Sequence, residues 1–554
     1  MSPSEASART RPQPESQPPR GWAAIISRLT ALAANPKAQA LALMLLVAQV
    51  LWGLRRSQDL PSTDEAWALT DGLRLAHGGA VSVSWWNSPL YTLLYAASGA
   101  LLRTAEATFY GQRLALTLLS VLAIFWLLRR LLPAPLAWLG AAWFAVSPQL
   151  IDLPLDRSDF LAAAICTWAA LAILDHRSAR RFGAALALAV AAFLFRPEYL
   201  LVVGAVSFYG LAQLLYQRLP QPKRTRQLVV GGIGLALATG GAALAVAVLF
   251  RSGSIGGYFM WVFANNRLPI VRDAPIWVVF ERDYGPSHTI LAILGHPAAL
   301  ARDVLANTRR MVEFAKAATT GTAWAALSLR VERWMAALAL LALAAAVRAR
   351  RDLPAVWNTF WAGNTNGWLG VACLLPLLAT NFILAPLPIY LLLFMPIIFG
   401  GLLLLGYAAL RGLLVTKPIF FPLLIAAMLV IAPVARSFTG EQPVRHLVDF
   451  FRQLPATGPA LIMLGDASTT ICAYLEATGQ ACAADEWTDN SGYPKLDDLM
   501  RRRPYTYLVY DNNMAYLLAQ PVGLSEVLAK RDPRWQLVQV YGEYQVYQYV
   551  AGQP

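Results

Sequence analysis

The chain has 554 residues, of which 57% are hydrophobic and 14% are charged. Soluble globular proteins carry about 25% charged residues, so this composition excludes that class and predicts a membrane protein with many spans. The formal net charge of +14 does not indicate a nucleic-acid partner, because the basic residues cluster in short segments between apolar runs and report topology instead.

We expect residues 1–36 to form a disordered cytoplasmic segment. Its first part is rich in Pro, Ser, Gln and Arg and buries too little apolar surface to fold, so we expect it to be disordered. An apolar run follows at 38–54. No small-residue cleavage pattern comes after this run, so we interpret it as a retained membrane helix and not as a removed signal peptide.

Apolar runs continue through residues 37–436, the predicted membrane domain. A spanning helix needs roughly 20 apolar residues, within a range of about 17–25, and about eleven runs meet this criterion. The loops between alternate runs are basic, which predicts a plasma (inner) membrane protein with a cytoplasmic N-terminus and, for an odd number of spans, an extracytoplasmic C-terminus. The expected spans are 38–54, 112–129, 134–151, 159–174, 182–196, 199–216, 228–250, 328–347, 367–385, 389–410 and 418–435.

This topology places the acidic and mixed-charge segments on the outer face. They are the loop 55–112, the turn from Asp152 to Asp159, the Arg196-Pro197-Glu198 turn and the segment 251–327. Carboxylates held near a bilayer are costly and usually mark an ion path, a proton relay or a catalytic base.

The first outer loop contains two predicted helices. Residues 64–76 form one, with Ser62 or Thr63 as its cap and an acidic first turn that suits the positive end of the helix dipole. The apolar stretch that starts at Pro89 is too short to span and suits a helix lying in the membrane interface. Its aromatic residues, with those just before it, are expected at headgroup level: Trp85, Trp86, Tyr91 and Tyr95.

Residues 437–554 differ in composition and predict a small extracytoplasmic α/β domain. Strands are expected at 460–466 and 505–510, helices at 444–454 and 468–478, and a hairpin with a Gly turn at 535–550. Cys472 and Cys482 lie in this part. If it is extracytoplasmic they can form a disulfide, and two unpaired thiols are the equal alternative.

Several short motifs follow one another along the membrane domain in a fixed order. They are Asp64-Glu65 after the first span, Pro89-Leu90-Tyr91, Ser158-Asp159 before a span, Arg196-Pro197-Glu198, and Tyr390 to Pro396 within a late span. From about Leu41 to Pro396, this order resembles the integral-membrane glycosyltransferases of the GT-C fold, in particular protein O-mannosyltransferases and bacterial aminoarabinose (lipid A) transferases. Relatives often carry Arg-Tyr where this chain has Ile389-Tyr390.

The resemblance implies transfer of a sugar from a polyprenyl-phosphate donor to a glycan, lipid or protein acceptor outside the cytoplasm. Asp64 matches the family's catalytic Asp and is the expected general base, with Glu65 orienting the acceptor or assisting. Asp159 matches the second acidic position, and Asp156 is an alternative in the same turn. The departing phosphate needs positive charge, for which the candidates are Arg196, Arg267 and Arg272.

Structural roles compete with each of these assignments. Asp64 and Glu65 would then cap a helix in a wet loop, Asp156 would anchor the end of a span, and Arg196 would pair with Glu198 to close a proline turn. No metal site is predicted, because the five histidines do not cluster. No cofactor is expected to be required, although a divalent ion at Asp159 is compatible with the residues.

Two other functions fit the composition. A transporter or flippase of lipid-linked sugars would use charges within the spans as an ion relay, but here the acidic residues occur at span ends. A non-catalytic cell-envelope assembly protein would work through its C-terminal domain. No glycine-rich phosphate loop indicates use of a nucleotide-sugar.

Overall fold

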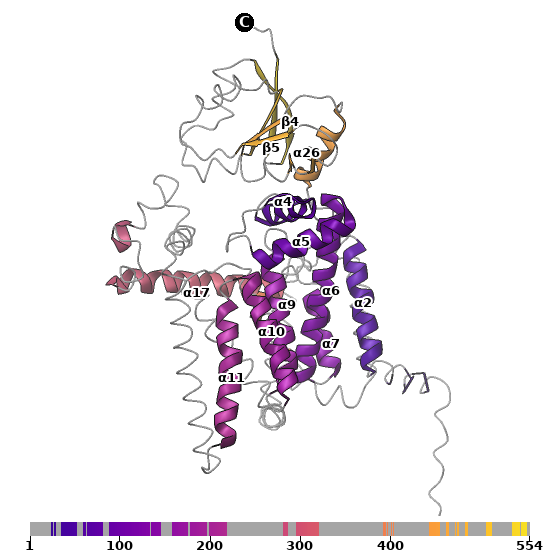
Figure 1. The fold of residues 1–554 in the computed structure, drawn as a ribbon, viewed down its shortest axis with the longest axis vertical. Coiled ribbons are helices and arrows are strands. Elements are labelled where there is room, and N and C mark those ends of the chain that lie inside the picture. Colours follow the sequence, from indigo (N-terminus) through magenta and orange to yellow (C-terminus); the bar gives the residue numbers. More distant parts are fainter. Residues whose placement is uncertain are drawn as a thin grey trace, which may run out of the picture.

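Helices make up most of the first part of the computed structural model, and a β-sheet lies in the last part (Figure 1). The expected spans 228–250, 328–347, 367–385 and 418–435, and most of 389–410, lie outside the residues that the structure describes. The described residues are 35–52, 59–61, 64–80, 88–132, 134–145, 158–175, 178–196, 199–218, 281–285, 295–320, 442–454, 461–464, 482–485, 506–511, 534–542 and 544–550, with isolated residues near 24–31, 392–403 and 471–475.

The remaining expected spans are all found as helices. Within the described residues, α6 is the helix that is long and apolar enough to cross a membrane by itself, and several others are apolar but shorter. The helices up to residue 218 are α2 (Pro36–Trp52), α4 (Asp64–Ala76), α5 (Pro89–Leu102), α6 (Ala105–Leu131), α7 (Ala134–Ala145), α9 (Ser158–Ile173), α10 (Ala179–Phe195) and α11 (Leu200–Arg218).

Polar residues set the ends of the helices α6 and α10. The Thr104 side chain accepts a hydrogen bond from the Ala107 N–H at 3.2 Å, and Ser178 accepts one from the Arg181 N–H at 3.3 Å. Each bond satisfies an N–H that has no partner within its helix. Arg129 and Arg130 in the last turn of α6 suit the negative end of its dipole.

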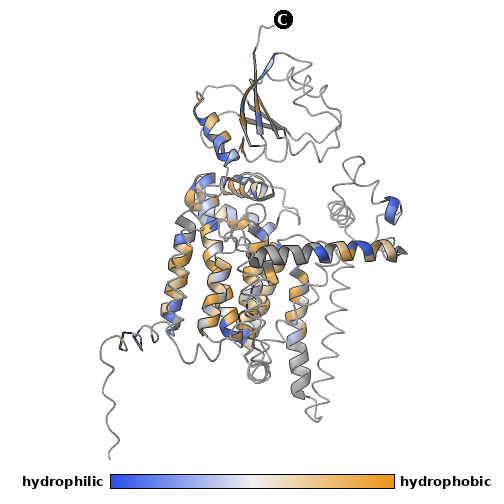
Figure 2. Ribbon diagram, turned by 180° about the vertical axis from the view of Figure 1, so that it is seen from behind, coloured by the Kyte–Doolittle hydropathy of each residue, from blue (hydrophilic) through white to orange (hydrophobic). Residues whose placement is uncertain are grey.

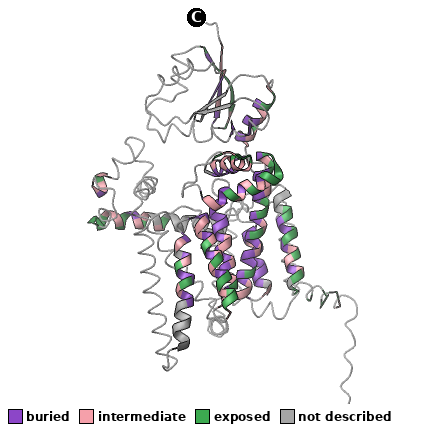
Figure 3. Ribbon diagram, in the orientation of Figure 1, coloured by how far each residue is buried: buried purple, intermediate pink, exposed green. Residues whose placement is uncertain are grey.

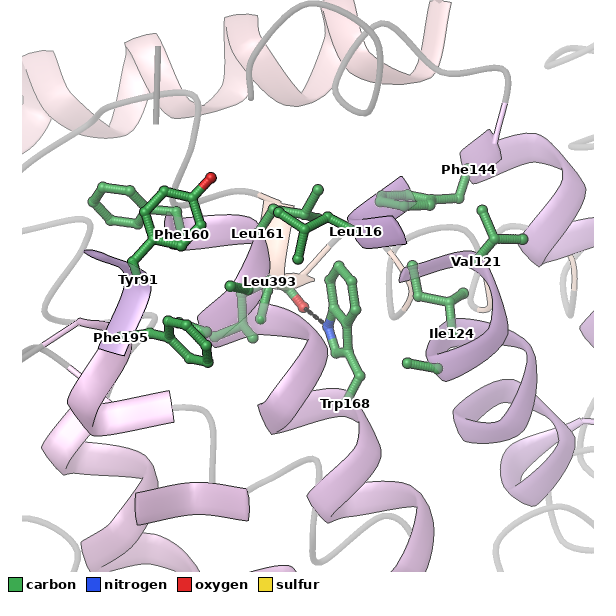
Figure 4. Close-up of a cluster of buried hydrophobic side chains, with 14 of the residues drawn as sticks. Tyr91, Leu116, Val121, Ile124, Phe144, Phe160, Leu161, Trp168, Phe195 and Leu393 are labelled. Carbon is green, nitrogen blue, oxygen red and sulfur yellow. Dashed lines mark hydrogen bonds between the residues drawn. The ribbon is translucent and has the colours of Figure 1, made fainter. Parts of the chain in front are cut away.

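The helix α9 lies at the centre of the bundle, between α6 and α10 (Figure 3). Its first residues and a run of alanines are almost completely buried, so neighbouring helices approach closely. Trp168 on α9 packs edge-on against Phe144 of α7, with ring centroids 5.6 Å apart, and its indole N–H donates to the Leu393 carbonyl at 3.0 Å (Figure 4). These contacts fix the later half of α9, about 15 Å along the helix from its first turn, where the site described below is built.

The helices α4 and α5 lie across the ends of the upright helices and pack tightly on each other (Figure 1). Gly72 allows this approach, because a Cβ added there would lie 2.3 Å from the Cβ of Tyr95 and 3.0 Å from the backbone N of Ala96. The contact therefore positions Tyr95 under α4.

We expect Gly72→Ala to destabilise the protein by about 1–3 kcal/mol, since the new methyl group overlaps backbone that cannot move without separating α4 from α5. Thermal unfolding in detergent measures the loss. Gly183→Ala on α10 is the matched control, because nothing lies within 4 Å of its added Cβ. The control should raise stability slightly through helix propensity, and equal losses for both variants would contradict the tight α4–α5 contact.

The last part of the chain folds into a five-stranded sheet in the order β2-β1-β3-β5-β4. The first three strands in this order run parallel, while β5 pairs antiparallel with β3 and β4. The predicted strands and hairpin are confirmed, but β2 was not predicted, because its residues Cys-Ala-Ala-Asp show neither alternation nor β-branched side chains. The strands are β1 (Leu461–Leu464), β2 (Cys482–Asp485), β3 (Tyr507–Asp511), β4 (Trp535–Tyr541) and β5 (Tyr544–Tyr549).

The helix α26 (Pro443–Arg452), predicted at 444–454, joins this sheet to the helices of the first part of the chain. The carboxylate of Asp59 accepts hydrogen bonds from the N–H groups of Val444 at 2.7 Å and Arg445 at 2.9 Å, at the positive end of α26. On α6, Glu106 lies 3.6 Å from the Arg445 guanidinium and 3.7 Å from that of Arg452. One buried core includes side chains from both parts.

We expect Asp59→Ala to release α26 at a cost of about 2 kcal/mol, because two N–H bonds to a charged acceptor are lost at a helix start. Faster hydrogen exchange in 443–452 measures this release. Asp449→Ala is the control, since Asp449 lies on the same helix with its side chain 49% exposed. Unchanged exchange in the Asp59 variant would contradict the role of this contact in docking.

The predicted outer segment 251–327 contains α17 (Pro297–Thr320), which was not predicted. It runs across the direction of α10 and α11, and hydrophilic and hydrophobic residues alternate along it (Figures 1 and 2). Asp303 accepts a hydrogen bond from Tyr284, and Arg302 pairs with Asp283 at 2.8 Å. An amphipathic helix of this kind suits a membrane interface.

Candidate functional site

The site is built around Glu65, in the first turn of α4. Only 2% of this residue is exposed. Its Oε1 accepts hydrogen bonds from Tyr91, at 2.5 Å, and from Tyr95, which lies one helical turn further along α5. Its Oε2 accepts the N–H of Ser158 at 2.8 Å. The side chain therefore ties three helices together at one point: α4, α5 and the start of α9.

The environment of Glu65 opposes its negative charge. Burial raises the pKa of Glu65 to about 7, although the three hydrogen bonds lower it, and the nearby charge of Asp159 raises it further. A carboxyl group ordinarily titrates near pH 4.5, so the folded protein holds this proton more tightly than the unfolded chain. The protonated Glu65 therefore contributes its full stabilisation of the folded protein below about pH 4.5, and this contribution is lost as the pH rises through about 7.

A second acidic group, Asp159, lies beside it in the first turn of α9. Its Oδ2 is 3.1 Å from Nη1 of Arg196 and accepts a hydrogen bond from the Ser88 hydroxyl at 2.7 Å. The side chains of Asp159 and Arg196 are only 12% and 6% exposed. The Arg196 guanidinium also lies over the ring of Phe160, 3.8 Å from its centroid. The ion pair is thus buried and held from several sides.

Ser88 reaches Asp159 from a strained backbone. Its φ of 46° is in the left-handed region, which side chains other than Gly adopt at a cost of about 1–3 kcal/mol. The next residue, Pro89, opens α5. The strained turn leads into α5 and places the Ser88 hydroxyl against Asp159.

Ser158 links the two acidic groups. Its N–H donates to Glu65, and its hydroxyl accepts a hydrogen bond from Arg113 Nη1 at 3.3 Å. Arg113, on α6, is 2% exposed. Two carboxyl groups and two guanidinium groups therefore meet where α4, α5, α6, α9 and α10 converge, and their formal charges offset each other.

The residues predicted from sequence fall into three groups. Glu65, Asp159 and Arg196 come together as described. Asp64 is the first residue of α4 and the chain neighbour of Glu65, and its side chain is not described. The remaining predicted residues lie outside the described part of the chain: Asp156, Arg267 and Arg272.

Two sequence-based interpretations are wrong. Tyr91 and Tyr95 do not face the lipid headgroups, because each is 1% exposed and donates to Glu65. Glu65 is not an acidic residue of a wet loop. Arg196, for which a pairing with Glu198 was the structural alternative, pairs with Asp159.

Four residues were not predicted to belong to the site: Ser88, Tyr91, Tyr95 and Arg113. The spacing of the two tyrosines, four residues apart on a helix opened by proline, was the available signal for a shared partner. Arg113 stands at the start of an apolar run, where a charged residue marks a functional position or an interfacial anchor. In the described residues, no group of three or more His, Cys, Asp or Glu side chains is arranged to hold a metal ion.

No family model and no curated protein matches the sequence. Among solved structures, the chain is similar to the oligosaccharyltransferase AglB from Archaeoglobus fulgidus, in complex with an inhibitory peptide and a dolichol-phosphate. The identity is 12% and the TM-score 0.45, over 86% of this chain and 70% of AglB. It is also similar to ArnT from Cupriavidus metallidurans in the apo state, with 15% identity and a TM-score of 0.39, over 92% of this chain and 98% of ArnT.

Proposed function

We propose that the protein is a membrane glycosyltransferase. It transfers one sugar from a polyprenyl-phosphate carrier to a glycan, lipid or protein acceptor on the extracytoplasmic face. The observation that supports this most is the meeting of two acidic positions far apart in sequence. Glu65, the chain neighbour of Asp64, accepts a hydrogen bond from the N–H of Ser158. Ser158 is 93 residues away in sequence and directly precedes Asp159. They meet where the loop helices cross the ends of the apolar helices.

The proposed chemistry assigns the base to Asp64. Its carboxylate takes the proton of the acceptor hydroxyl while that oxygen forms a bond to the anomeric carbon of the sugar. The bond from that carbon to the phosphate oxygen breaks, and the polyprenyl phosphate leaves with the electron pair. In an inverting transfer the base and the leaving phosphate stand on opposite faces of the sugar.

Positive charge is needed where the phosphate leaves. Arg196 stands at the end of α10, and its charge is partly offset by Asp159 at 3.1 Å. We propose that this buried pair lies beneath the phosphate, while Arg267 and Arg272 of the long outer segment contact it directly. We place Arg196 beneath the phosphate and not in direct contact with it, because only 6% of its side chain is exposed.

The outward orientation rests on two observations. The basic residues of the sequence favour a cytoplasmic N-terminus. Cys472, in the C-terminal part, is disulfide-bonded, and disulfides persist in oxidising compartments outside the cytoplasm. The sheet domain is then extracytoplasmic, and it is docked on α6 near the site through α26, where it can contribute to acceptor binding.

A panel of labelled donors tests the proposed function. Purified protein in detergent is given membrane extract as the acceptor source, together with sugars linked either to polyprenyl phosphate or to nucleotides. We expect loss of sugar from a polyprenyl-phosphate donor and none from any nucleotide donor. Cleavage of nucleotide-sugars alone would overturn the proposal. Movement of intact lipid-linked sugar across vesicles, driven by a proton gradient and without cleavage, would identify a flippase instead.

A further inference from the structure

Glu65 is a buried acidic group that the proposed chemistry does not use. Its carboxyl group accepts three hydrogen bonds, from Tyr91 and Tyr95 on α5 and from the first N–H of α9. The acceptor hydroxyl and the sugar have no access to a side chain that is 2% exposed. A role in direct contact with substrate, either orienting the acceptor or sharing the work of the base, therefore does not fit its surroundings.

The three bonds have a geometric consequence. Asp64 precedes Glu65 in the first turn of α4, while Asp159 follows Ser158 in the first turn of α9. The bond from Ser158 to Glu65 thus holds the starts of these two helices together, one residue away from each proposed functional side chain. The tyrosines hold α5 against the same carboxyl group, and α5 begins beside Ser88, which also binds Asp159.

We propose that Glu65 is a positioning residue whose carboxyl group fixes the start of α4 against the start of α9, so that Asp64 is held at a set distance from the Asp159–Arg196 pair. This inference rests on the proposed function. Displacing a reacting group by about 1 Å can lower a rate by about 100-fold. The residue therefore acts on turnover without touching the substrate.

The ionised carboxylate is the form that suits this role, because it only accepts hydrogen bonds and three donors surround it. When the group takes up a proton it loses its negative charge, and the hydrogen bonds from the tyrosines and from Ser158 are no longer strengthened by that charge. Other charged or ionisable groups also act on it or lie around it: Tyr91, Tyr95, Arg113, Asp159, Arg196 and Tyr474 of the C-terminal part.

The first test compares the wild-type protein with Glu65→Gln. The amide oxygen can still accept from the tyrosines, but the amide N–H₂ then faces the Ser158 N–H, donor against donor. We expect kcat to fall by roughly 10- to 100-fold with little change in the KM for the donor. The wild-type kcat should rise through pH 7 as Glu65 ionises, and this limb should be absent in Glu65→Gln. Unchanged kcat per folded molecule and an unchanged pH profile would overturn the proposal.

The second test removes the donors to Glu65. Tyr91→Phe and Tyr95→Phe keep the packing and lose one hydrogen bond each, so we expect each to lower kcat several-fold and to shift the limb near pH 7. Tyr549→Phe, in β5, is the control and should change neither quantity. If the wild-type protein releases no sugar from any donor, the proposed function fails. If it is active and all three site variants match it, only the positioning role fails.

Discussion

Asp64→Asn should lower the rate of sugar transfer by about 10²–10⁴-fold, the contribution that a positioned general base typically makes. The amide has nearly the shape of the carboxylate but cannot take the proton from the acceptor hydroxyl. Because Asp64 opens α4, the substitution also leaves a residue that is well suited to a helix start. The protein should therefore fold normally and bind the donor while failing in turnover, which single-turnover release of labelled sugar measures.

Asp71→Asn is the matched control for this result. Asp71 lies on the same helix, seven residues further on, where its carboxylate is 3.7 Å from Arg74 and its side chain is 19% exposed. The same chemical change there should alter the rate less than about twofold, because the residue is about 10 Å along the helix from Asp64. If Asp64→Asn retained the wild-type rate with normal folding, the assignment of the base would be wrong. Equal losses in both variants would point to a defect of α4 as a whole.

Arg196→Met should destabilise the folded protein by about 3–5 kcal/mol, because it leaves the Asp159 carboxylate buried without its charged partner. The side chains of this pair are only 6% and 12% exposed. The double variant Arg196→Met/Asp159→Asn should recover much of the loss, since no unpaired charge remains. Unfolding in mixed detergent, measured for both single variants and the double variant, gives the coupling between the two residues.

An exposed ion pair of the same type serves as the control. Arg181 and Asp175 lie 3.3 Å apart, with side chains 67% and 28% exposed. We expect Arg181→Met to change stability by about 0–1 kcal/mol, because water screens the pair and its side chains give up freedom to form it. A loss of similar size for Arg181→Met and Arg196→Met, or independent effects of Arg196 and Asp159, would contradict a structural role for the buried pair.

The sequence was sufficient to predict the elements that depend on hydropathy and local capping. Apolar runs marked α2, α6, α7, α9, α10 and α11, because burial in a bilayer needs long apolar helices whatever their neighbours are. Alternation and a glycine turn marked the hairpin of β4 and β5. The strand β2 carries no such pattern, since its place is set by pairing with β1 along the sheet.

The site could be predicted only in part, because its contacts are distant in sequence. The acidic residues Glu65 and Asp159 stood out since carboxylates near a membrane are costly. Their partners did not stand out. A tyrosine near an interface looks the same whether it faces headgroups or donates to Glu65, and Arg113 resembles any cation at the end of a span. The contact of Asp59 with Val444 crosses 385 positions, beyond the reach of a local pattern.

The most direct test of the proposed function is an experimental structure of the protein with a polyprenyl phosphate bound, for which a dolichol-phosphate is a suitable first probe. We expect the phosphate to lie at the starts of α4 and α9, close to Asp64 and above the Asp159–Arg196 pair, with the lipid chain running along the apolar helices. A phosphate bound at the opposite ends of those helices, or away from both acidic positions, would contradict this expectation.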